Sequence, residues 1–470
     1  MSISSLQDDM FAELRGHRLL DRARSHACEY VDEIRGRRVF PADEAILGLQ
    51  AFHEPMPENP TTGERILSLL HAQGSPATVA STGGRYFGFV NGGVLPAALA
   101  VRWLADAWDQ NAALHLTSPV ASELEAVCEG WMVDLLGLPA GTAAGFVTGS
   151  AGATLCGLAA GRNELLKRLG WDVDADGLFG APRLRVVAGE QAHATVGKAL
   201  GVLGLGKARV ERVPSDGQGR MMTGQMPALD QSCLVVAQAG NVNSGAFDDL
   251  VGIGERARRA GAWMHVDGAF GLWAAASSSK RHLTLGAELA DSWSVDAHKT
   301  LNAPYDCGVI LCRQRSALVA AMQTSASYIL GSGKRDGMHL TVDMSRRARG
   351  IELWAALKSL GRSGVQDLVD RLCGHAELLA GSLARRGFRI LNDVVFNQVL
   401  VACDTPAATE ATLARLQGAG ECWCGGTTWN GQSAIRVSVC SWATTADDVE
   451  RSVKAFVAAR ESAGGGGRPV

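Results

Sequence analysis

Short apolar runs alternate with helix-like segments in the middle of this chain, and this alternation restricts the fold more than any other feature. The runs at 184–187, 234–237, 262–266 and 308–312 are apolar at most successive positions. Strands of this kind are covered by helices on both faces, which is typical of a largely parallel sheet. The sequence therefore predicts a large α/β domain over 76–330, with its ligand at the carboxyl ends of the strands.

The first 75 residues predict a helical arm that has no core of its own. Apolar residues from Leu19 to Ala27 fall near helical spacing, and the segment 45–52 repeats the pattern before three prolines interrupt it. An amphipathic arm needs another surface to cover its apolar stripe. We therefore expect the arm, residues 1–75, to pack on the rest of the protein or on a second copy of the chain, which predicts a homodimer.

The last third of the chain predicts a smaller α+β domain over 331–463. A polar linker leads to a helical pattern at 351–360, and strand-like runs follow at 399–402 and 435–439. The glycine-rich segment 464–470 has the composition of a disordered tail.

Two helix starts stand out in the large domain. Ser122 and Glu125 have the spacing of a capping box, which predicts that a helix begins at Ser122. Gly149, Ser150 and Ala151 open a second helical pattern with small residues. Backbone N–H groups at such a start bind anions such as phosphate, although glycine-rich helix starts are also common without a ligand.

A lysine and an aspartate lie at the ends of two predicted strands. Lys299 comes shortly after a short apolar stretch, and Asp267 comes directly after the run 262–266. A desolvated lysine forms a Schiff base with an aldehyde cofactor, and a carboxylate keeps a pyridine nitrogen protonated. Together they indicate pyridoxal phosphate (PLP) as the cofactor.

Composition excludes several other classes of function. The chain has 470 residues, of which 47% are hydrophobic and 20% charged, so two or three globular domains are expected. The net charge of −3 argues against nucleic acid as the main partner. No apolar run reaches membrane-spanning length and the first residues are polar, so we expect no membrane association and a cytoplasmic protein.

Eleven cysteines do not indicate a metal centre. The chain has no Cys-x-x-Cys pair, and most of its cysteines lie inside apolar stretches. The close pair Cys422 and Cys424 has no histidine nearby in the sequence, so we expect buried free thiols and no metal.

Three segments carry a resemblance to a known family. The runs HVDGAF at 265–270, SVDAHKTLNAPYDCG at 294–308 and RYFGFVNGG at 85–93 resemble the group II pyridoxal-dependent amino-acid decarboxylases, which include the aromatic amino-acid and glutamate decarboxylases. The resemblance extends from about residue 35 to about residue 457. It implies the PLP-dependent transferase fold (fold type I), an amino-acid-like substrate that loses carbon dioxide, and a homodimer with a shared active site.

The resemblance also implies roles for individual residues. It assigns the catalytic roles to Lys299, which would hold the cofactor, to Asp267, which would face the ring nitrogen, and to His193, which would stack on the ring. It assigns the remaining cofactor contacts to Gly149, Ser150, Ala151 and His298 around the phosphate, to Ala269 on the opposite ring face, and to Asn243 in a nearby turn. It places Phe87 and Phe89 at the substrate entrance. Arg346 and Arg436 are candidates for the substrate carboxylate because guanidinium binds carboxylate in a fork, although a solvated edge-strand position also explains Arg436.

One departure from the family leaves the outcome of the reaction open. Its decarboxylases place a tyrosine on a loop where it protonates the substrate carbon after carbon dioxide leaves, but the stretch 331–343 contains none, and Tyr328 precedes it. His339 or His193 would then be the proton donor. Decarboxylation coupled to oxidative deamination, β-elimination and, more remotely, an aminotransferase reaction stay as alternatives, whereas intact Lys299, Asp267 and His193 argue against a carrier without activity.

Overall fold

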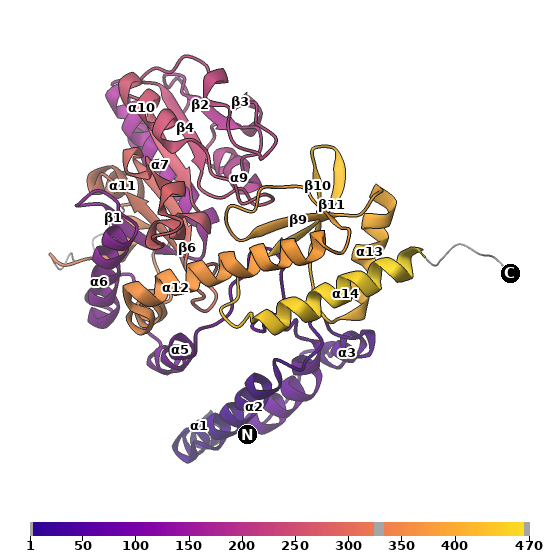
Figure 1. The fold of residues 1–470 in the computed structure, drawn as a ribbon. Coiled ribbons are helices and arrows are strands. Elements are labelled where there is room, and N and C mark those ends of the chain that lie inside the picture. The colour runs from indigo at the N-terminus through magenta and orange to yellow at the C-terminus, as the bar shows by residue number, and fades with distance from the viewer. Residues whose placement is uncertain (1–2, 324–332, 465–470) are drawn as a thin grey trace.

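A seven-stranded sheet forms the centre of the computed structural model, which describes residues 3–323 and 333–464 (Figure 1). Its strand order is β1-β7-β6-β5-β4-β2-β3, and β7 alone runs antiparallel to its neighbours. The strands are β1 (Ala143–Val147), β2 (Arg185–Gly189), β3 (Glu211–Val213), β4 (Cys233–Gln238), β5 (Trp263–Asp267), β6 (Ser292–Asp296) and β7 (Gly308–Cys312). The expected α/β domain with a largely parallel sheet is therefore confirmed.

Helices cover both faces of this sheet and bury it. Those of the large domain are α5 (Pro96–Trp108), α6 (Pro119–Leu135), α7 (Ser150–Arg168), α8 (Val173–Asp176), α9 (Ala194–Val202), α10 (Leu250–Ala260) and α11 (Arg315–Met322). Short helical turns are η4 (Lys207–Arg209), η5 (Thr223–Gln225), η6 (Gly271–Ala276), η7 (Arg281–Thr284), η8 (Ala287–Leu289) and η9 (Gly337–Leu340). Helix α7 lies so close to β5 that a Cβ atom on Gly157 would be 2.7 Å from His265 Nδ1.

The expected capping box at Ser122 is wrong. Helix α6 begins three residues earlier with Pro119, and the Ser118 hydroxyl caps it by accepting the Ala121 N–H. Proline at the first helical position and serine at the cap are a stronger start signal together than Ser122 alone. The Glu125 carboxylate instead forms a buried pair with Arg346.

A second, four-stranded antiparallel sheet forms the smaller domain. Its strand order is β10-β11-β9-β8, with β8 (Arg389–Ile390), β9 (Gln398–Ala402), β10 (Gly425–Trp429) and β11 (Gln432–Ser438). Its helices are α12 (Gly350–Ala384), α13 (Pro406–Ala419) and α14 (Ala446–Gly464). The helix expected at 351–360 is the first part of α12, which bends at Gly361 (φ 60°) and continues. The expected α+β domain is confirmed.

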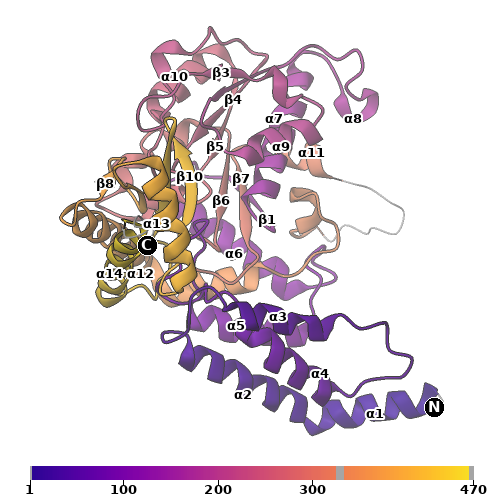
Figure 2. The ribbon, with the colours of Figure 1, turned by 90° about the vertical axis from the view of Figure 1, so that its right-hand side faces the viewer.

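The N-terminal arm lies along one side of the two sheet domains (Figures 1 and 2). It contains α1 (Ile3–Gly16), α2 (Arg18–Glu33), α3 (Asp43–Gly48), α4 (Gly63–Leu69) and the short turns η1 (Leu49–Phe52), η2 (Leu70–Gly74) and η3 (Ser75–Ala77). No side chain of α2, α3 or α4 is buried, as expected for an arm without its own core. None of the described helices has both the length and the apolar content of a membrane span. The expected disordered tail lies almost entirely outside the described residues.

Candidate active site

The carboxyl ends of β5 and β6 bring the predicted lysine and aspartate together. Asp267 ends β5 and is paired in register with Ser294 on β6, and Lys299 lies in the turn that follows β6. Parallel neighbouring strands end at the same edge of a sheet, so their terminal side chains share one crevice.

A cavity of about 420 Å³ opens at this edge. Its lining residues are Phe89, Val90, His193, Gln238, Gly240, Val242, Asp267, Ala269, Phe270, Lys299 and Arg436. Six predicted site residues therefore meet here: Lys299, Asp267, His193, Ala269, Phe89 and Arg436. A larger and more open hollow of about 620 Å³ lies between α13 and α14. Its charged side chains face solvent, whereas those of the smaller cavity converge on an enclosed space. The smaller cavity is therefore the candidate site.

The Asp267 carboxylate is buried and held in place by two donors. Its Oδ1 accepts the Ala269 N–H at 3.2 Å and the Ser294 hydroxyl at 3.4 Å. A carboxylate fixed in this way on a strand end is suited to meet a cationic ring nitrogen in the cavity.

His193 faces the same cavity from the start of α9. Its Nδ1 lies 2.8 Å from Thr195 Oγ1 and accepts the Thr195 backbone N–H at 3.4 Å, which leaves Nε2 to carry the proton of the neutral ring. Burial lowers the pKa of His193, and the Lys299 and Arg436 cations act in the same direction, while Asp267 opposes them. The ring is therefore neutral at pH 7 and donates from Nε2.

A buried carboxylate occupies the helix start that the sequence assigns to phosphate. Asp296 Oδ1 accepts the Ser150 N–H at 2.5 Å, and Asp296 Oδ2 lies 3.0 Å from Lys299 Nζ. Residues 149–151 do not line the cavity, and Asp296 connects them to Lys299. Asp296 was not among the predicted site residues, although its place at the end of a strand is the signal that identified Asp267.

His298 and two glycines complete this region. His298 Nδ1 accepts the Cys307 N–H at 3.1 Å, so its Nε2 carries the proton of the neutral ring, and Nε2 lies 3.7 Å from Asp296 Oδ2. A Cβ atom on Gly149 would be 3.3 Å from His298 Cε1, and one on Gly308 would be 2.4 Å from Gly149 Cα. The backbone of residue 149 is therefore packed directly against His298 and the first residue of β7.

Arg436 presents a cation to the cavity from a central strand of the smaller sheet. β11 pairs with both β10 and β9, so the edge-strand explanation of Arg436 is wrong. Its Nη1 donates to the Val242 carbonyl at 3.4 Å, and its buried Nε has no hydrogen-bond partner among the described residues. Burial lowers the pKa of this guanidinium. An unpaired donor of this kind is a candidate for binding a substrate carboxylate.

Besides His298 and residues 149–151, four more predicted site residues lie away from the cavity lining. The Arg346 guanidinium is buried and forms a bidentate pair with Glu125 at 2.7 and 2.9 Å. Phe87 is fully buried in the core of the smaller domain. Asn243 Oδ1 accepts the Thr427 hydroxyl at 3.0 Å, and His339 lies in η9, which packs on β1 and α11. Within one subunit, the structure does not bring these four residues to the cavity.

Sequence reasoning also missed part of the cavity wall. Gln238 ends β4, and Gly240 and Val242 follow it, so the strand-end rule that identified Asp267 applies to them as well. Val90 was missed because its signal is conformational: Phe89 and Val90 have φ values of 53° and 62°, which are unusual for side chains of these types. The Phe89 ring stacks on Trp423 with centroids 5.4 Å apart.

The chain is similar to known proteins in both sequence and fold. Residues 50–402 match the family model "Pyridoxal-dependent decarboxylase conserved domain". The chain is 28% identical over 463 residues to the aromatic-L-amino-acid decarboxylase of Sus scrofa, covering 91% of each chain, and 28% identical over 330 residues to the acidic amino acid decarboxylase GADL1 of Mus musculus, covering 67% of this chain and 59% of the relative. The crystal structure of Oryza sativa TDC with PLP and tryptamine superimposes with a TM-score of 0.87 at 20% identity, covering 96% of this chain and 98% of that one.

Proposed function

The chain belongs to the pyridoxal-dependent decarboxylase family, and we propose that its cavity binds an amino acid with an apolar, aromatic side chain through Lys299, Asp267, His193 and Arg436. The family match confirms PLP as the cofactor, a carboxy-lyase as the enzyme class and fold type I as the architecture. The single observation that carries the proposal is that these four side chains line one cavity.

The cavity fits PLP in its chemistry. The Lys299 amine would react with the cofactor aldehyde, the fixed Asp267 carboxylate would pair with a protonated ring nitrogen, and the small Ala269 side chain would leave space for the ring. The N-terminus of α7 lies outside the cavity lining, and its Ser150 N–H, which Asp296 accepts in this structure, would serve with His298 as a donor for a phosphate. When bound, PLP supplies an electron sink for the bond that breaks at the substrate α-carbon.

His193 and Arg436 act on the substrate carboxylate. The neutral His193 ring donates from Nε2, and the unpaired Arg436 Nε offers a second donor from the opposite domain. Two donors from different elements fix the direction of the carboxylate, and that direction decides which α-bond is broken. Removal of either donor therefore reduces selectivity between bonds as well as rate.

The apolar part of the cavity wall favours an apolar substrate side chain. Phe89, Val90, Val242 and Phe270 supply that part, and Lys299 and Arg436 are the two cations in the described lining. Both cations are assigned to the reacting end of the substrate. The described lining therefore has no further cation to pair with the side chain of an acidic substrate. The relative from Sus scrofa acts, by its name, on aromatic amino acids and supports this preference.

A substrate panel tests the proposed specificity. Carbon dioxide release from aromatic, aliphatic and acidic L-amino acids is measured with the loaded enzyme at equal concentration. We expect an aromatic amino acid to give the highest kcat/KM, and Phe89→Ala to lower that value without changing cofactor content. A preference for glutamate or aspartate would contradict the apolar assignment while leaving the decarboxylase chemistry intact.

The protein is a homodimer in this proposal, with the arm covering the partner subunit. Helices α2, α3 and α4 bury no side chain within one chain, and they expose Leu20, Leu47 and Ile66 at 63%, 67% and 53%. The neighbouring helix α5 exposes Trp103 and Trp108 as well. Apolar surface of this extent is typical of a subunit interface.

Sedimentation tests the dimer. We expect the wild-type chain to sediment as a dimer at micromolar concentration and Leu20→Glu to shift it toward monomer. Phe179→Glu is the matched control, because Phe179 is 97% exposed but lies outside the arm. A wild-type monomer with full activity would contradict the dimer.

A further inference from the structure

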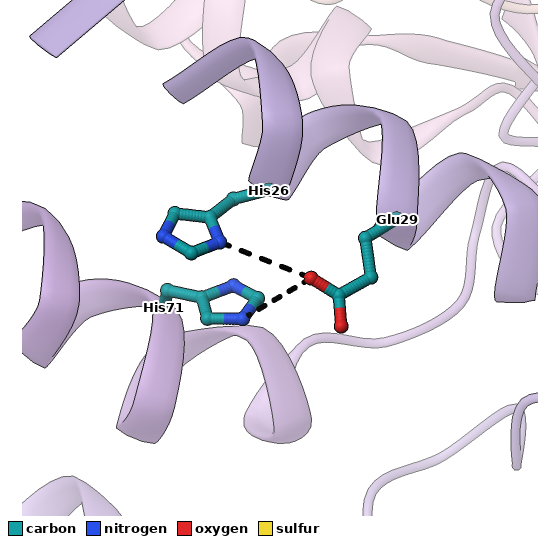
Figure 3. A group of neighbouring side chains, drawn as sticks. All are labelled: His26, Glu29 and His71. Atoms are coloured by element: carbon teal, nitrogen blue, oxygen red, sulfur yellow. Dashed lines mark ion pairs between the residues drawn. The ribbon is translucent and has the colours of Figure 1, made fainter. Parts of the chain in front are cut away.

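Three side chains with metal-binding chemistry meet on the N-terminal arm, on elements that contribute nothing to the cavity. His26 and Glu29 lie on α2, and His71 lies on η2 (Figure 3). Glu29 Oε2 is 3.8 Å from His26 Nδ1 and 3.6 Å from His71 Nε2. The three ligand atoms all lie within 4.8 Å of one another.

These separations suit three ligands around one ion better than direct pairs. Both exceed the length of a hydrogen bond, so neither imidazole is hydrogen-bonded to the carboxylate. Zinc bonds to histidine nitrogen and carboxylate oxygen are about 2.0–2.2 Å, which gives ligand-to-ligand distances of roughly 3.4 Å in a tetrahedron. The two carboxylate-to-imidazole distances are within a few tenths of an ångström of that value, and the three ligand atoms together lie within 4.8 Å of one another.

The two imidazoles are adjacent but are oriented for stacking. Their ring centroids are 3.7 Å apart with an interplanar angle of 15°, so each ring has to rotate about its side-chain bonds for both lone pairs to point at one ion. The buried His26 Nε2 has no hydrogen-bond partner among the described residues. His71 Nδ1 lies 3.4 Å from Ser75 Oγ, and an N–H donated to that hydroxyl leaves the Nε2 lone pair free for a metal.

Local structure explains why these residues converge. His26 and Glu29 are three positions apart and therefore share one face of α2. η2 is a π-helical turn, a form that is rare and often marks a functional site. The Arg22–Glu64 ion pair joins α2 to α4 just before η2 and fixes the approach of the two elements.

We propose that His26, Glu29 and His71 bind a zinc ion that links α2 to η2 within the arm. Two imidazoles and one carboxylate suit a borderline ion such as Zn²⁺, whereas Mg²⁺ and Ca²⁺ prefer oxygen ligands. Glu29 is 55% exposed, so a water molecule completes the coordination and the ion exchanges with solvent. No sequence motif indicates this site, because His71 is distant from the other two ligands along the chain.

Zinc titration of the full-length, PLP-loaded enzyme tests the site. Chelator-treated protein is titrated with Zn²⁺ against a chromophoric competitor, and Co²⁺ binding is followed by its visible absorption. We expect about one zinc per chain and at least about ten-fold weaker binding in each of His26→Gln, Glu29→Gln and His71→Gln. Cobalt absorption typical of tetrahedral coordination is expected in the wild type and absent in these variants, while circular dichroism shows an unchanged fold.

Two control variants separate this site from other metal-binding groups. His17→Asn removes an exposed histidine at the start of α2, and Cys28→Ser removes the one exposed cysteine, since the other ten are buried. Both are expected to bind zinc as the wild type does. Zinc binding that is absent in the wild type, unchanged in the three ligand variants, or lost in Cys28→Ser would overturn the proposal.

Discussion

The Lys299 ammonium lies 3.0 Å from the Asp296 carboxylate, whose other oxygen accepts the Ser150 N–H at the start of α7. One buried carboxylate thus binds both the amine that takes the cofactor aldehyde and the helix start expected to take its phosphate. A phosphate at this helix start would compete with Asp296 for the N–H and would stand close to a like charge. We therefore expect Asp296 to oppose cofactor loading.

Asp296→Asn is expected to bind PLP more tightly than the wild type. Like charges a few ångströms apart oppose each other by on the order of 1–4 kcal/mol at the effective dielectric of a protein, so we expect about a ten-fold gain or more. The measurement is the dissociation constant of PLP from each apoenzyme. Asp306→Asn is the matched control, since this carboxylate of the β6–β7 connection pairs with Arg349. Equal or weaker binding by Asp296→Asn would show that the carboxylate does not compete.

Asp267→Asn is expected to retain bound cofactor but to lose activity. An amide does not keep the ring nitrogen protonated, so the electron sink weakens, and we expect kcat to fall on the order of a hundredfold. Cofactor content is measured by absorbance after release in alkali, and kcat by carbon dioxide release. Turnover at the wild-type rate would remove the assigned role of Asp267.

Acid is expected to destabilise the large domain through His265. Burial lowers the pKa of His265 to about 3, whereas the unfolded ring titrates near 6.5. Below pH 6.5 the unfolded state binds a proton that the folded state does not, so the free energy of unfolding falls as the pH falls through this window. The loss is about 1.4 kcal/mol per pH unit, or about 2 kcal/mol between pH 6.5 and 5.

Chemical denaturation at pH 7.5 and pH 5 measures this effect. The His265→Phe variant keeps an aromatic ring beside Gly157 but has no group that titrates, so we expect a smaller drop in stability on acidification than in the wild type. An identical drop in the two proteins would show that His265 does not carry the pH dependence.

The sequence predicts much of this site because its chemistry lies at strand ends. Asp267 and Lys299 each follow an apolar run, and the period of the pattern places both at one edge of a sheet. Contacts between residues that are far apart along the chain leave no such pattern in the sequence. The sequence indicated a capping role for Glu125 and a carboxylate-binding role for Arg346, but in the fold these two side chains pair with each other. It also indicated an edge-strand position for Arg436, but β11 has a neighbouring strand on each side.

The products of the reaction are expected to include more than an amine. No tyrosine lies in 331–343, and Tyr86 and Tyr305 do not line the cavity, whereas His193 does, so we expect His193 to serve as the proton donor. Tyr328 lies outside the described residues. Slow protonation leaves the carbon that lost carbon dioxide open to oxygen, or to loss of a β-substituent. We expect slow amine formation from ordinary L-amino acids, with measurable oxygen uptake and aldehyde release, or keto-acid release from a β-substituted substrate. Fast and stoichiometric amine formation without oxygen uptake would contradict this expectation.

Borohydride reduction followed by peptide mass mapping tests the central claim most directly, because it fixes the cofactor to whichever amine holds it. We expect the label on Lys299 in the wild-type enzyme. We expect Lys299→Ala to bind PLP without covalent label and without turnover, because contacts to the ring and phosphate do not depend on the lysine. A label on another lysine, or full activity in Lys299→Ala, would contradict the assignment of this cavity as the active site.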